Sequence, residues 1–145
     1  MNDMAQYGIG WVGQMTLSER LRLAIVDDDE DVRAALSRLL RAMGHEVRVF
    51  SSAEDFEAEP VPVDCAIVDI RLPGLSGLEL RERLRTQGEP PPVVLITGDG
   101  DRLARDVGCG VDTPLLTKPF DVGILTEAIA SAISMAAFQR ERHAY

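Results

Sequence analysis

The sequence predicts one α/β domain built on a parallel β-sheet with helices on both of its faces. Short apolar runs of strand length alternate with segments in which apolar residues recur at helical spacing, as in successive βα units. The length of 145 residues suits one domain with a sizeable core. In addition, charged residues directly follow three of the apolar runs, and the carboxyl ends of parallel strands share one crevice in which ligands collect.

Five segments are predicted to form strands. Residues 23–26, 66–69, 93–97 and 115–117 are apolar runs, and residues 46–50 alternate between polar and apolar positions as a half-buried strand does. Four of these five segments end beside polar groups. The acidic triplet 27–29 follows residues 23–26, residues 66–69 end on Asp69, residues 93–97 end on Thr97, and Lys118 follows residues 115–117. We therefore expect three carboxylates, a hydroxyl and an ammonium group to converge on one pocket.

Helices are predicted between the first strands. Apolar residues from Val32 to Met43 recur at helical spacing, and Gly44 supplies the stop. Ser52, followed three residues later by Asp55, predicts a short capped helix that ends near residue 60. Another helix is expected to begin near residue 76 and to stop by residue 88.

The last two helices are predicted to differ in length. Residues 101–107 allow about two turns, and the glycines and proline that follow prevent a long helix. This segment is therefore expected to be short or mobile. Asp121 is the predicted N-cap of the final helix, along which one apolar stripe runs: Leu125, Ala128, Ile129, Ala132, Ile133 and Ala136, widened by Ile124 and Met135. We expect this stripe to pack on the sheet; the alternative is that its margin also forms a dimer or partner surface.

The chain divides into a tail and a domain. Residues 1–18 show neither strand nor helical periodicity, which predicts a flexible N-terminal tail. An alternative is that Trp11 in this tail docks on a partner. Residues 19–142 are expected to form the folded domain.

Charge and cysteine content narrow the function classes. The formal net charge of −9 argues against binding to nucleic acid or to an anionic membrane, because both are negatively charged and bind to basic protein surfaces. A protein or cation partner is expected instead. The two cysteines are interpreted as unrelated thiols, as in a reducing cytoplasm. No run of about 20 uninterrupted apolar residues and no signal peptide is recognisable, so a soluble cytoplasmic protein is expected.

The acidic residues predict a divalent metal site. Carboxylates crowded at strand ends repel one another and lose solvation, so a cation is the natural compensation. Hard oxygen ligands favour Mg²⁺, which takes one or two protein carboxylates and keeps several waters. Aspartates after a strand also make good turns and N-caps. This structural interpretation is preferred for Asp29, Glu30 and Asp31, whereas Asp27 and Asp28, taken together with Asp69 and Lys118, are interpreted as functional.

At this point the sequence resembles the receiver domain of two-component response regulators. The resemblance covers about residues 21–140, and the four matching blocks occur in the family's order at nearly its spacing. It implies a flavodoxin-like, doubly wound sheet with five parallel strands in the order 2-1-3-4-5. The blocks are Ile25-Val26-Asp27-Asp28-Asp29, Asp69-Ile70-Arg71-Leu72-Pro73-Gly74-Leu75-Ser76-Gly77, Ile96-Thr97-Gly98 and Lys118-Pro119-Phe120.

The resemblance also implies a role for each site residue. Asp69 is expected to be the phosphoacceptor, which takes a phosphoryl group from the phosphohistidine of a sensor histidine kinase. Asp28, Asp69 and the backbone carbonyl of Arg71 would ligate Mg²⁺, with Mn²⁺ as an alternative ion, and Asp27 would act mainly through water. Lys118, in a cis peptide bond to Pro119, would contact a phosphoryl oxygen, and Thr97 would turn its hydroxyl toward the phosphoryl group.

Three further positions are expected to adjust the signal. Arg71 and Asp99 would flank the path of an attacking water and tune the lifetime of the acyl phosphate, and they could pair with each other before phosphorylation. Many receivers couple the threonine to an aromatic ring three residues before the lysine, but here that position is Leu115. We therefore expect phosphorylation to order or displace residues 101–114 rather than to swing a ring.

The resulting functional hypothesis is a single-domain response regulator that is not an enzyme in its own right. Because the chain stops soon after the final helix, no output domain is expected, and the protein would act by protein contact, by passing the phosphoryl group to a phosphotransfer protein, or as a phosphate sink. Two alternatives remain. One is a small Mg²⁺-dependent phosphohydrolase with Asp27 as nucleophile and Asp29 as general acid, and the other is a pseudo-receiver that binds a partner without phosphorylation.

Overall fold

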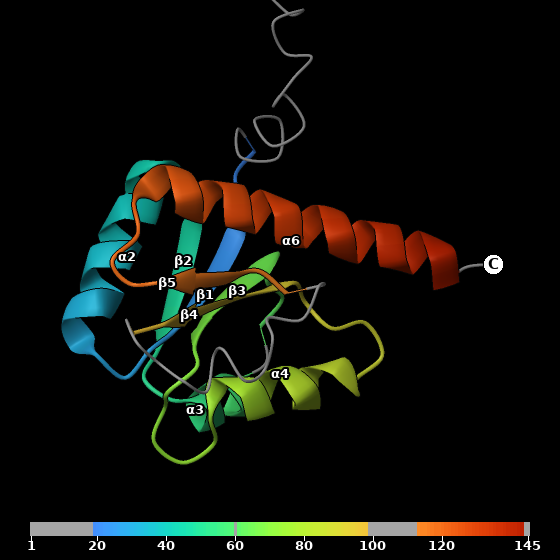
Figure 1. The fold of residues 1–145 in the computed structure, drawn as a ribbon, viewed down its shortest axis with the longest axis horizontal. Coiled ribbons are helices and arrows are strands. Elements are labelled where there is room, and N and C mark those ends of the chain that lie inside the picture. The colour runs from blue at the N-terminus through green and yellow to red at the C-terminus, as the bar shows by residue number, and fades with distance from the viewer. Residues whose placement is uncertain (1–18, 60, 99–112, 144–145) are drawn as a thin grey trace, which may run out of the picture.

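The computed structural model describes residues 19–59, 61–98 and 113–143. A five-stranded parallel sheet runs through the centre in the order β2-β1-β3-β4-β5, with helices on both faces (Figure 1). The strands are β1 (Arg22–Val26), β2 (Glu46–Phe50), β3 (Cys65–Asp69), β4 (Val93–Thr97) and β5 (Leu115–Thr117). The described helices are α2 (Glu30–Ala42), α3 (Ala53–Ala58), α4 (Gly77–Arg85) and α6 (Val122–His143). The predicted flavodoxin-like fold and its strand order are confirmed.

Strand register brings the polar residues to one edge of the sheet. Val26, the last residue of β1, pairs with Phe50 on one side and with Val68 on the other. Asp69 pairs with Ile96, and Thr97 pairs with Thr117. The residues that end or follow β1, β3, β4 and β5 therefore lie at the same carboxyl edge, as the sequence predicts.

Two hydrophobic cores hold the sheet between the helix layers. Alternate residues of the central strands point to opposite faces. Leu23, Ile25 and Ile67 pack with residues of α2 and α6, whereas Val26 and Val68 belong to the core formed with α3 and α4. β3 and β4 are buried along their whole length, which fixes the position of the residues at their ends.

The helix boundaries follow the predicted capping residues. Ser52 accepts the N–H of Asp55 at the start of α3, and Asp121 accepts the N–H of Ile124 at 2.8 Å at the start of α6. α2 ends at Ala42, directly before a turn in which Gly44 has a φ of 97°. At the start of α4, Ser76 and Glu79 form a reciprocal capping box. These caps confirm the helix starts and stops taken from the sequence.

The final helix is both long and apolar. Residues Val122–Glu141 of α6 have a mean hydropathy of 1.4, and by length and composition this segment is able to cross a membrane. However, Leu125, Ala128, Ile129 and Ala132 of this segment belong to the core against the sheet, as the predicted stripe requires. Ile124, expected to widen that stripe, is exposed instead, together with Val122 and Phe138.

Some predictions concern residues outside the described ranges. They are the flexible tail with Trp11, the short or mobile helix at residues 101–107, and the positions of Asp99 and Cys109. Cys65 is a buried free thiol in β3, and burial raises its pKa to about 12.

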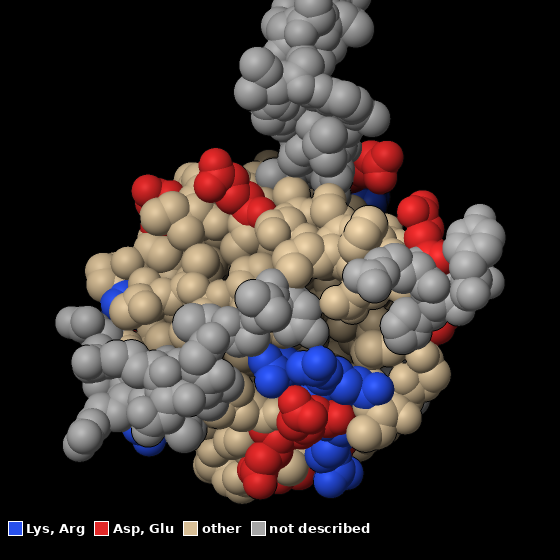
Figure 2. Space-filling model, turned by 45° about the vertical axis from the view of Figure 1, so that its right-hand side comes forward, with Lys and Arg blue, Asp and Glu red and all other residues tan. Residues whose placement is uncertain are grey.

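Charges of both signs lie side by side on one face of the molecule (Figure 2). In that view they gather in the lower part, where α3 and α4 lie in Figure 1. Ion pairs on these helices join Arg83 to Glu57 at 2.8 Å and Arg85 to Glu82 at 3.7 Å. Among the described side chains on this face, positive charge forms no broad area apart from acidic neighbours.

Candidate functional site

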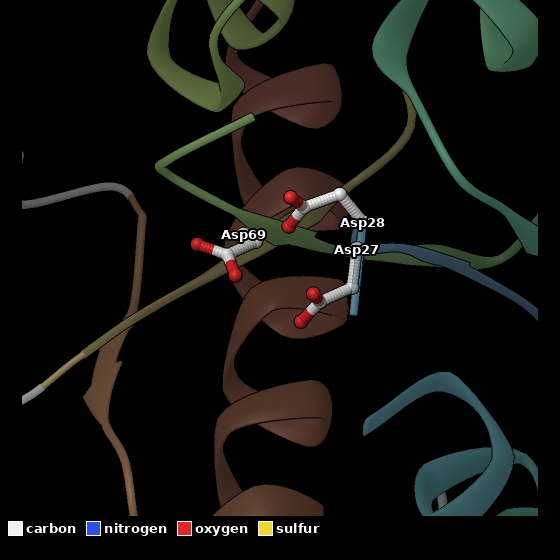
Figure 3. Close-up of side chains that lie close together, drawn as sticks. All are labelled: Asp27, Asp28 and Asp69. Atoms are coloured by element: carbon white, nitrogen blue, oxygen red, sulfur yellow. The ribbon is translucent and has the colours of Figure 1, made fainter. Parts of the chain in front are cut away.

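Three aspartates from two strand ends face one another at the carboxyl edge (Figure 3). Asp27 and Asp28 follow β1, and Asp69 ends β3. One carboxylate oxygen from each lies within 4.8 Å of the others. Asp27 is fully buried and Asp69 is 6% exposed, whereas Asp28 is exposed. The cluster is therefore open to solvent on the side of Asp28 and closed on the side of Asp27.

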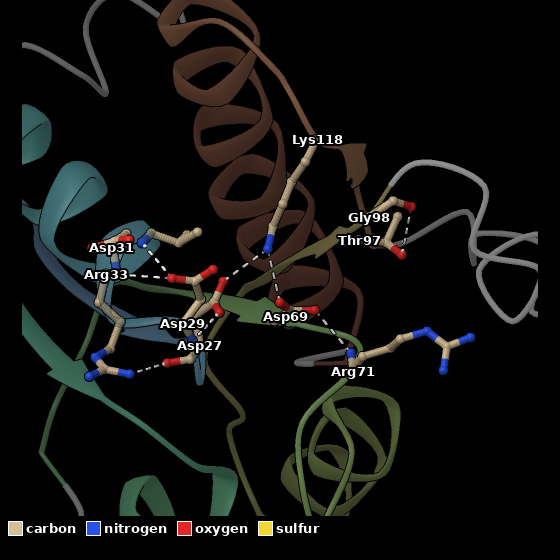
Figure 4. A network of polar contacts seen from close by, with 10 residues as sticks. Asp27, Asp29, Asp31, Arg33, Asp69, Arg71, Thr97, Gly98 and Lys118 are labelled. Carbon is tan, nitrogen blue, oxygen red and sulfur yellow. Dashed lines mark hydrogen bonds and ion pairs between the residues drawn. The ribbon is translucent and has the colours of Figure 1, made fainter.

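Backbone and side-chain hydrogen bonds hold Asp27 in place. Its N–H donates to the carbonyl of Phe50 at 3.1 Å, which continues the pairing of β1 with β2. Its carboxylate accepts the N–H of Asp29 at 2.9 Å, and its carbonyl accepts a hydrogen bond from Arg33 at 2.8 Å (Figure 4). These contacts fix both the backbone and the side chain at the point where the chain leaves the sheet.

Asp29 serves the helix rather than the pocket. Its Oδ1 accepts the N–H groups of Asp31 and Val32, at 2.9 and 3.3 Å, and so caps the N-terminus of α2. A carboxylate in this position stabilises a helix by typically about 1 kcal/mol. The structural interpretation of Asp29 is confirmed.

Asp69 combines burial with hydrogen bonding. Its Oδ1 accepts the N–H of Arg71 at 2.9 Å, and its Oδ2 accepts a hydrogen bond from Lys118 at 3.0 Å. Burial of the carboxyl raises the pKa of Asp69; the hydrogen bond from Lys118 opposes this effect, and the nearby charge of Asp27 adds to it. The net direction is upward, because burial and like-charge repulsion outweigh the two hydrogen bonds.

Lys118 reaches the two aspartates from the end of β5, at the same edge of the sheet. Its Nζ lies 3.0 Å from Asp69 and 3.3 Å from Asp27 (Figure 4). Burial alone would lower the pKa of Lys118, but its hydrogen bond to Asp69 and the charges of both aspartates raise it. Its N–H donates to the carbonyl of Thr97 at 2.8 Å, and its peptide bond to Pro119 is cis, as predicted. The ammonium group is thus held as a charged bridge between the two carboxylates.

Thr97 and Leu115 occupy the neighbouring strands. Thr97 is buried at the end of β4, and its hydroxyl lies 3.5 Å from the carbonyl of Gly98. Leu115 begins β5 and packs, partly buried, against the core on the α3 and α4 face. The side chain of Arg71 points away from the aspartates in Figure 4. The predicted pairing of Arg71 with Asp99 concerns a residue outside the described ranges.

The donor set fits a divalent cation. Three carboxylate oxygens within 4.8 Å of one another are the hard ligands that Mg²⁺ prefers. A single ammonium group, Lys118, contacts two of the three carboxylates, so the cluster retains negative charge. The exposure of Asp28 leaves one side of the cluster accessible to water and to a ligand.

A separate cavity lies at the other end of the sheet. It has a volume of about 710 Å³ and is lined by Val61, Pro91, Ile133 and Arg140, among others. None of the aspartates at the carboxyl edge contributes to it. Two of its acidic residues, Glu57 and Asp64, already form ion pairs with Arg83 and Arg22. We therefore place the chemistry at the carboxylate cluster.

Sequence reasoning missed two residues that support the site. The helical pattern places Arg33 in a helix and gives it no role at the site, yet its side chain donates a hydrogen bond to the carbonyl of Asp27. Arg33 lies near the start of the helix that follows Asp27, and this closeness in sequence is the feature from which the contact could have been predicted. Glu54 accepts the N–H of Leu75, a residue 21 positions away, and no local sequence pattern predicts such a contact.

The fold and the site together define a flavodoxin-like α/β domain with an acidic, metal-compatible pocket in which a lysine bridges two carboxylates. A family model, the response regulator receiver domain, matches residues 23–130. The chain belongs to this family, and its predicted resemblance is confirmed. Receiver domains of response regulators are phosphoacceptor signalling modules that sensor histidine kinases phosphorylate.

Individual relatives agree with this assignment. The chain is 38% identical over 121 residues to the response regulator protein TmoT of Ectopseudomonas mendocina, covering 81% of this chain and 54% of that protein. It is 36% identical to the transcriptional regulatory protein FixJ of Azorhizobium caulinodans, covering 85% of this chain and 60% of that protein. The structure of full-length FixJ from B. japonicum matches with a TM-score of 0.72 and 33% identity, covering 86% of this chain and 63% of that one. The chain thus spans little more than half the length of these relatives.

Proposed function

We propose that this chain accepts a phosphoryl group on Asp69 from the phosphohistidine of a sensor histidine kinase. The observation that carries this proposal is the placement of a buried Asp69 carboxylate 3.0 Å from the ammonium group of Lys118, beside Asp27 and Asp28. A carboxylate nucleophile needs alignment and charge neutralisation more than it needs a base. Family membership supports the same chemistry. We place this reaction in the cytoplasm, where sensor kinases present their phosphohistidine.

We propose that the reaction depends on Mg²⁺. Asp28, Asp69 and the backbone carbonyl of Arg71 would hold the ion, Asp27 would act through water, and Mn²⁺ would substitute because it accepts the same oxygen donors. When bound, the ion neutralises the charge of phosphoryl oxygens.

The chain's own residues have distinct parts in the transfer. An oxygen of Asp69 forms the new bond to phosphorus while the bond from phosphorus to the donor's imidazole nitrogen breaks, and that nitrogen keeps the electron pair and takes up a proton. Lys118, already placed beside Asp69, stabilises the negative charge on a phosphoryl oxygen as a fixed point charge. Thr97 would rotate its hydroxyl from Gly98 toward the phosphoryl group.

We propose that the output is contact with another protein, onward transfer to a phosphotransfer protein, or drainage of phosphoryl groups from the kinase. Arg71 and Asp99 would set the lifetime of the acyl phosphate. Because Leu115 takes the place of an aromatic ring, the change on phosphorylation would lie in residues 101–114 rather than in a ring rotation.

The phosphohydrolase alternative is less well supported. It needs Asp29 as a general acid, whereas the Asp29 carboxylate accepts two backbone N–H groups as the N-cap of α2. It also gives no role to the contact between Lys118 and Asp69. The pseudo-receiver alternative leaves the complete set of acidic and basic groups without a purpose.

Phosphotransfer to Asp69 is tested by incubating the full chain with a labelled sensor histidine kinase and Mg²⁺. Label should move to the wild-type chain and to the control variant Asp55→Ala, which loses a surface carboxylate on α3, but not to Asp69→Ala. Label on Asp69→Ala at the wild-type level would refute the proposal. Hydrolysis of small phosphomonoesters that survives in Asp69→Ala would instead favour the phosphohydrolase.

The rate at which label leaves Asp69 distinguishes the outputs. Rapid loss without any bound protein favours a phosphate sink, and a stable mark with a captured partner favours signalling by contact. If Arg71 and Asp99 tune this rate, Arg71→Ala and Asp99→Ala change it. Unchanged rates in both variants would remove these two residues from the mechanism.

A further inference from the structure

Glu54 reaches from α3 to the loop that follows the phosphoacceptor strand. Its Oε2 accepts the N–H of Leu75 at 2.8 Å. Leu75 lies in the segment between the end of β3 at Asp69 and the start of α4 at Gly77. Glu54 is exposed, and it stands in the first turn of α3. The contact therefore joins two elements through a surface side chain rather than through the core.

The Glu54 carboxylate also packs against the turn at Gly74. Gly74 has a φ of 74°, a backbone conformation that glycine adopts without strain. Pro73 followed by such a glycine is the pair that type II turns use. A Cβ at position 74 would lie 2.6 Å from Oε2 of Glu54. The carboxylate thus packs directly on the turn as well as binding its neighbour.

The other end of the same loop is joined to the site. The N–H of Arg71 donates to Asp69 at 2.9 Å, and the N–H of Gly77 donates to the carbonyl of Ile70 at 2.9 Å. The capping box of Ser76 and Glu79 fixes the entry to α4. Residues 72–75 lie between these fixed points. Among the described side chains, Glu54 binds their backbone from another element.

We propose that Glu54 is a positioning residue for the metal and phosphoryl site. By holding Leu75 and the turn at Gly74, it fixes the path of the loop and thereby the direction of the Arg71 carbonyl. Glu54 does not touch the reacting groups. This inference rests on the proposed function, in which the Arg71 carbonyl is a ligand of Mg²⁺. Groups that orient metal ligands typically change metal affinity 10- to 100-fold when they are removed.

The test compares three substitutions of Glu54 with one control. Glu54→Gln keeps an oxygen acceptor at the same reach without the charge, Glu54→Asp keeps the charge but is one methylene shorter, and Glu54→Ala removes both. The control, Glu59→Ala, removes a carboxylate at the other end of the same helix, where Glu59 pairs with Arg48. Mg²⁺ affinity is measured by calorimetry, and the exchange of the Leu75 amide hydrogen is measured by NMR.

We expect the length of the side chain at position 54, rather than its charge, to decide the result. Glu54→Ala and Glu54→Asp should exchange the Leu75 amide faster and bind Mg²⁺ about tenfold more weakly. Glu54→Gln and Glu59→Ala should stay close to the wild type in both measurements. Cooperative unfolding of each variant confirms that the domain still folds.

Two results would overturn the inference while leaving the proposed function intact. One is Glu54→Ala with wild-type Mg²⁺ affinity although the Leu75 amide exchanges faster, and the other is Leu75 exchange that does not change. A wild-type chain that binds no Mg²⁺ and accepts no label on Asp69 is a different result. It refutes the proposed function, and the inference about Glu54 falls with it.

Discussion

At the scale of single residues, the site depends on one cation placed between two buried carboxylates. Lys118 contacts both Asp27 and Asp69, and 28% of its side chain is exposed. A buried charge that loses its partner is costly, because neither solvent nor a hydrogen bond replaces the interaction. Lys118 therefore contributes to the stability of the free protein as well as to the proposed chemistry.

Replacing Lys118 with methionine should expose this dependence. In the absence of Mg²⁺ we expect Lys118→Met to lower the free energy of unfolding by about 1–3 kcal/mol, since two like charges are left facing each other. The loss should be smaller in an Asp69→Asn background, where one of these charges is already removed. Urea unfolding in EDTA measures both. An equal loss in the two backgrounds would show that the effect of Lys118 does not pass through Asp69.

His45 predicts a pH dependence away from the site. It is buried, its Nδ1 accepts the N–H of Leu21 at 3.1 Å, and its Nε2 has no hydrogen-bond partner within the described part of the chain. Burial lowers the pKa of His45 below its ordinary value of 6.5. The imidazole of His45 therefore binds a proton more readily in the unfolded chain than in the native chain. The contribution of neutral His45 to the free energy of unfolding is fully present above pH 6.5 and is lost as the pH falls toward the lowered pKa.

We expect the free energy of unfolding to decrease between about pH 7 and pH 5.5, partly because of His45. His45→Asn keeps an acceptor for Leu21 but does not titrate, so the decrease should be shallower. Denaturant unfolding at a series of pH values measures the slope. Identical slopes in the wild type and the variant would assign the pH dependence to other groups.

At the scale of elements, the close approach of α4 to the end of β3 fixes the position of Asp69, the proposed phosphoacceptor. A Cβ on Gly77 would collide with the backbone carbonyl of Asp69. The first residue of α4 therefore packs directly against the last residue of β3, and glycine is required there for space. By contrast, a Cβ on Gly88, in the connector after α4, would meet nothing within 4 Å.

Gly77→Ala should consequently destabilise the domain and displace Asp69. We expect a loss of about 1–3 kcal/mol or more, as for other overpacked positions, together with slower phosphorylation. The matched variant Gly88→Ala should stay within about 0.5 kcal/mol of the wild type. Thermal unfolding and phosphotransfer rates measure the two effects. Equal behaviour of the two variants would mean that the helix moves away from the strand at little cost.

The elements show which features a sequence can predict. Strands and caps follow local rules, so the four apolar runs, the alternating segment 46–50 and the capping residues Ser52 and Asp121 could be recognised directly. Contacts between elements could not be, because the reach of Glu54 to Leu75 depends on how α3 lies beside the loop. The exposure of Ile124 was missed for a similar reason: helical spacing defines a stripe but not how far the sheet extends beneath it.

The candidate site was predictable for a different reason. Asp27, Asp69 and Lys118 each stand at a strand end, and parallel strands bring such ends together whatever the details of packing. Their distances and the role of Arg33 required the structure. The tuning roles of Arg71 and Asp99 and the switch role of Leu115 remain predictions.

At the scale of the whole molecule, the negative charge of the cluster links metal binding to stability. A ligand that binds only the folded chain raises the free energy of unfolding, by about 2.7 kcal/mol at 100 times its dissociation constant. Mg²⁺ should therefore raise the melting temperature of the wild type. Asp28→Asn should lose most of this shift, yet be no less stable than the wild type in EDTA, because it removes one of three neighbouring like charges. Melting curves with and without Mg²⁺ measure this, and a full shift in Asp28→Asn would exclude Asp28 as a ligand.

The bridge formed by Lys118 joins chain segments that are far apart. Lys118 lies 91 positions from Asp27 and 49 from Asp69, and it directly follows β5, the most C-terminal strand of the described sheet. During synthesis the two aspartates are made long before their counter-charge, and an incomplete sheet presents them without it. Under the proposed function, a chain therefore accepts a phosphoryl group only once the segment that follows β5 has joined the sheet and brought Lys118 to both aspartates.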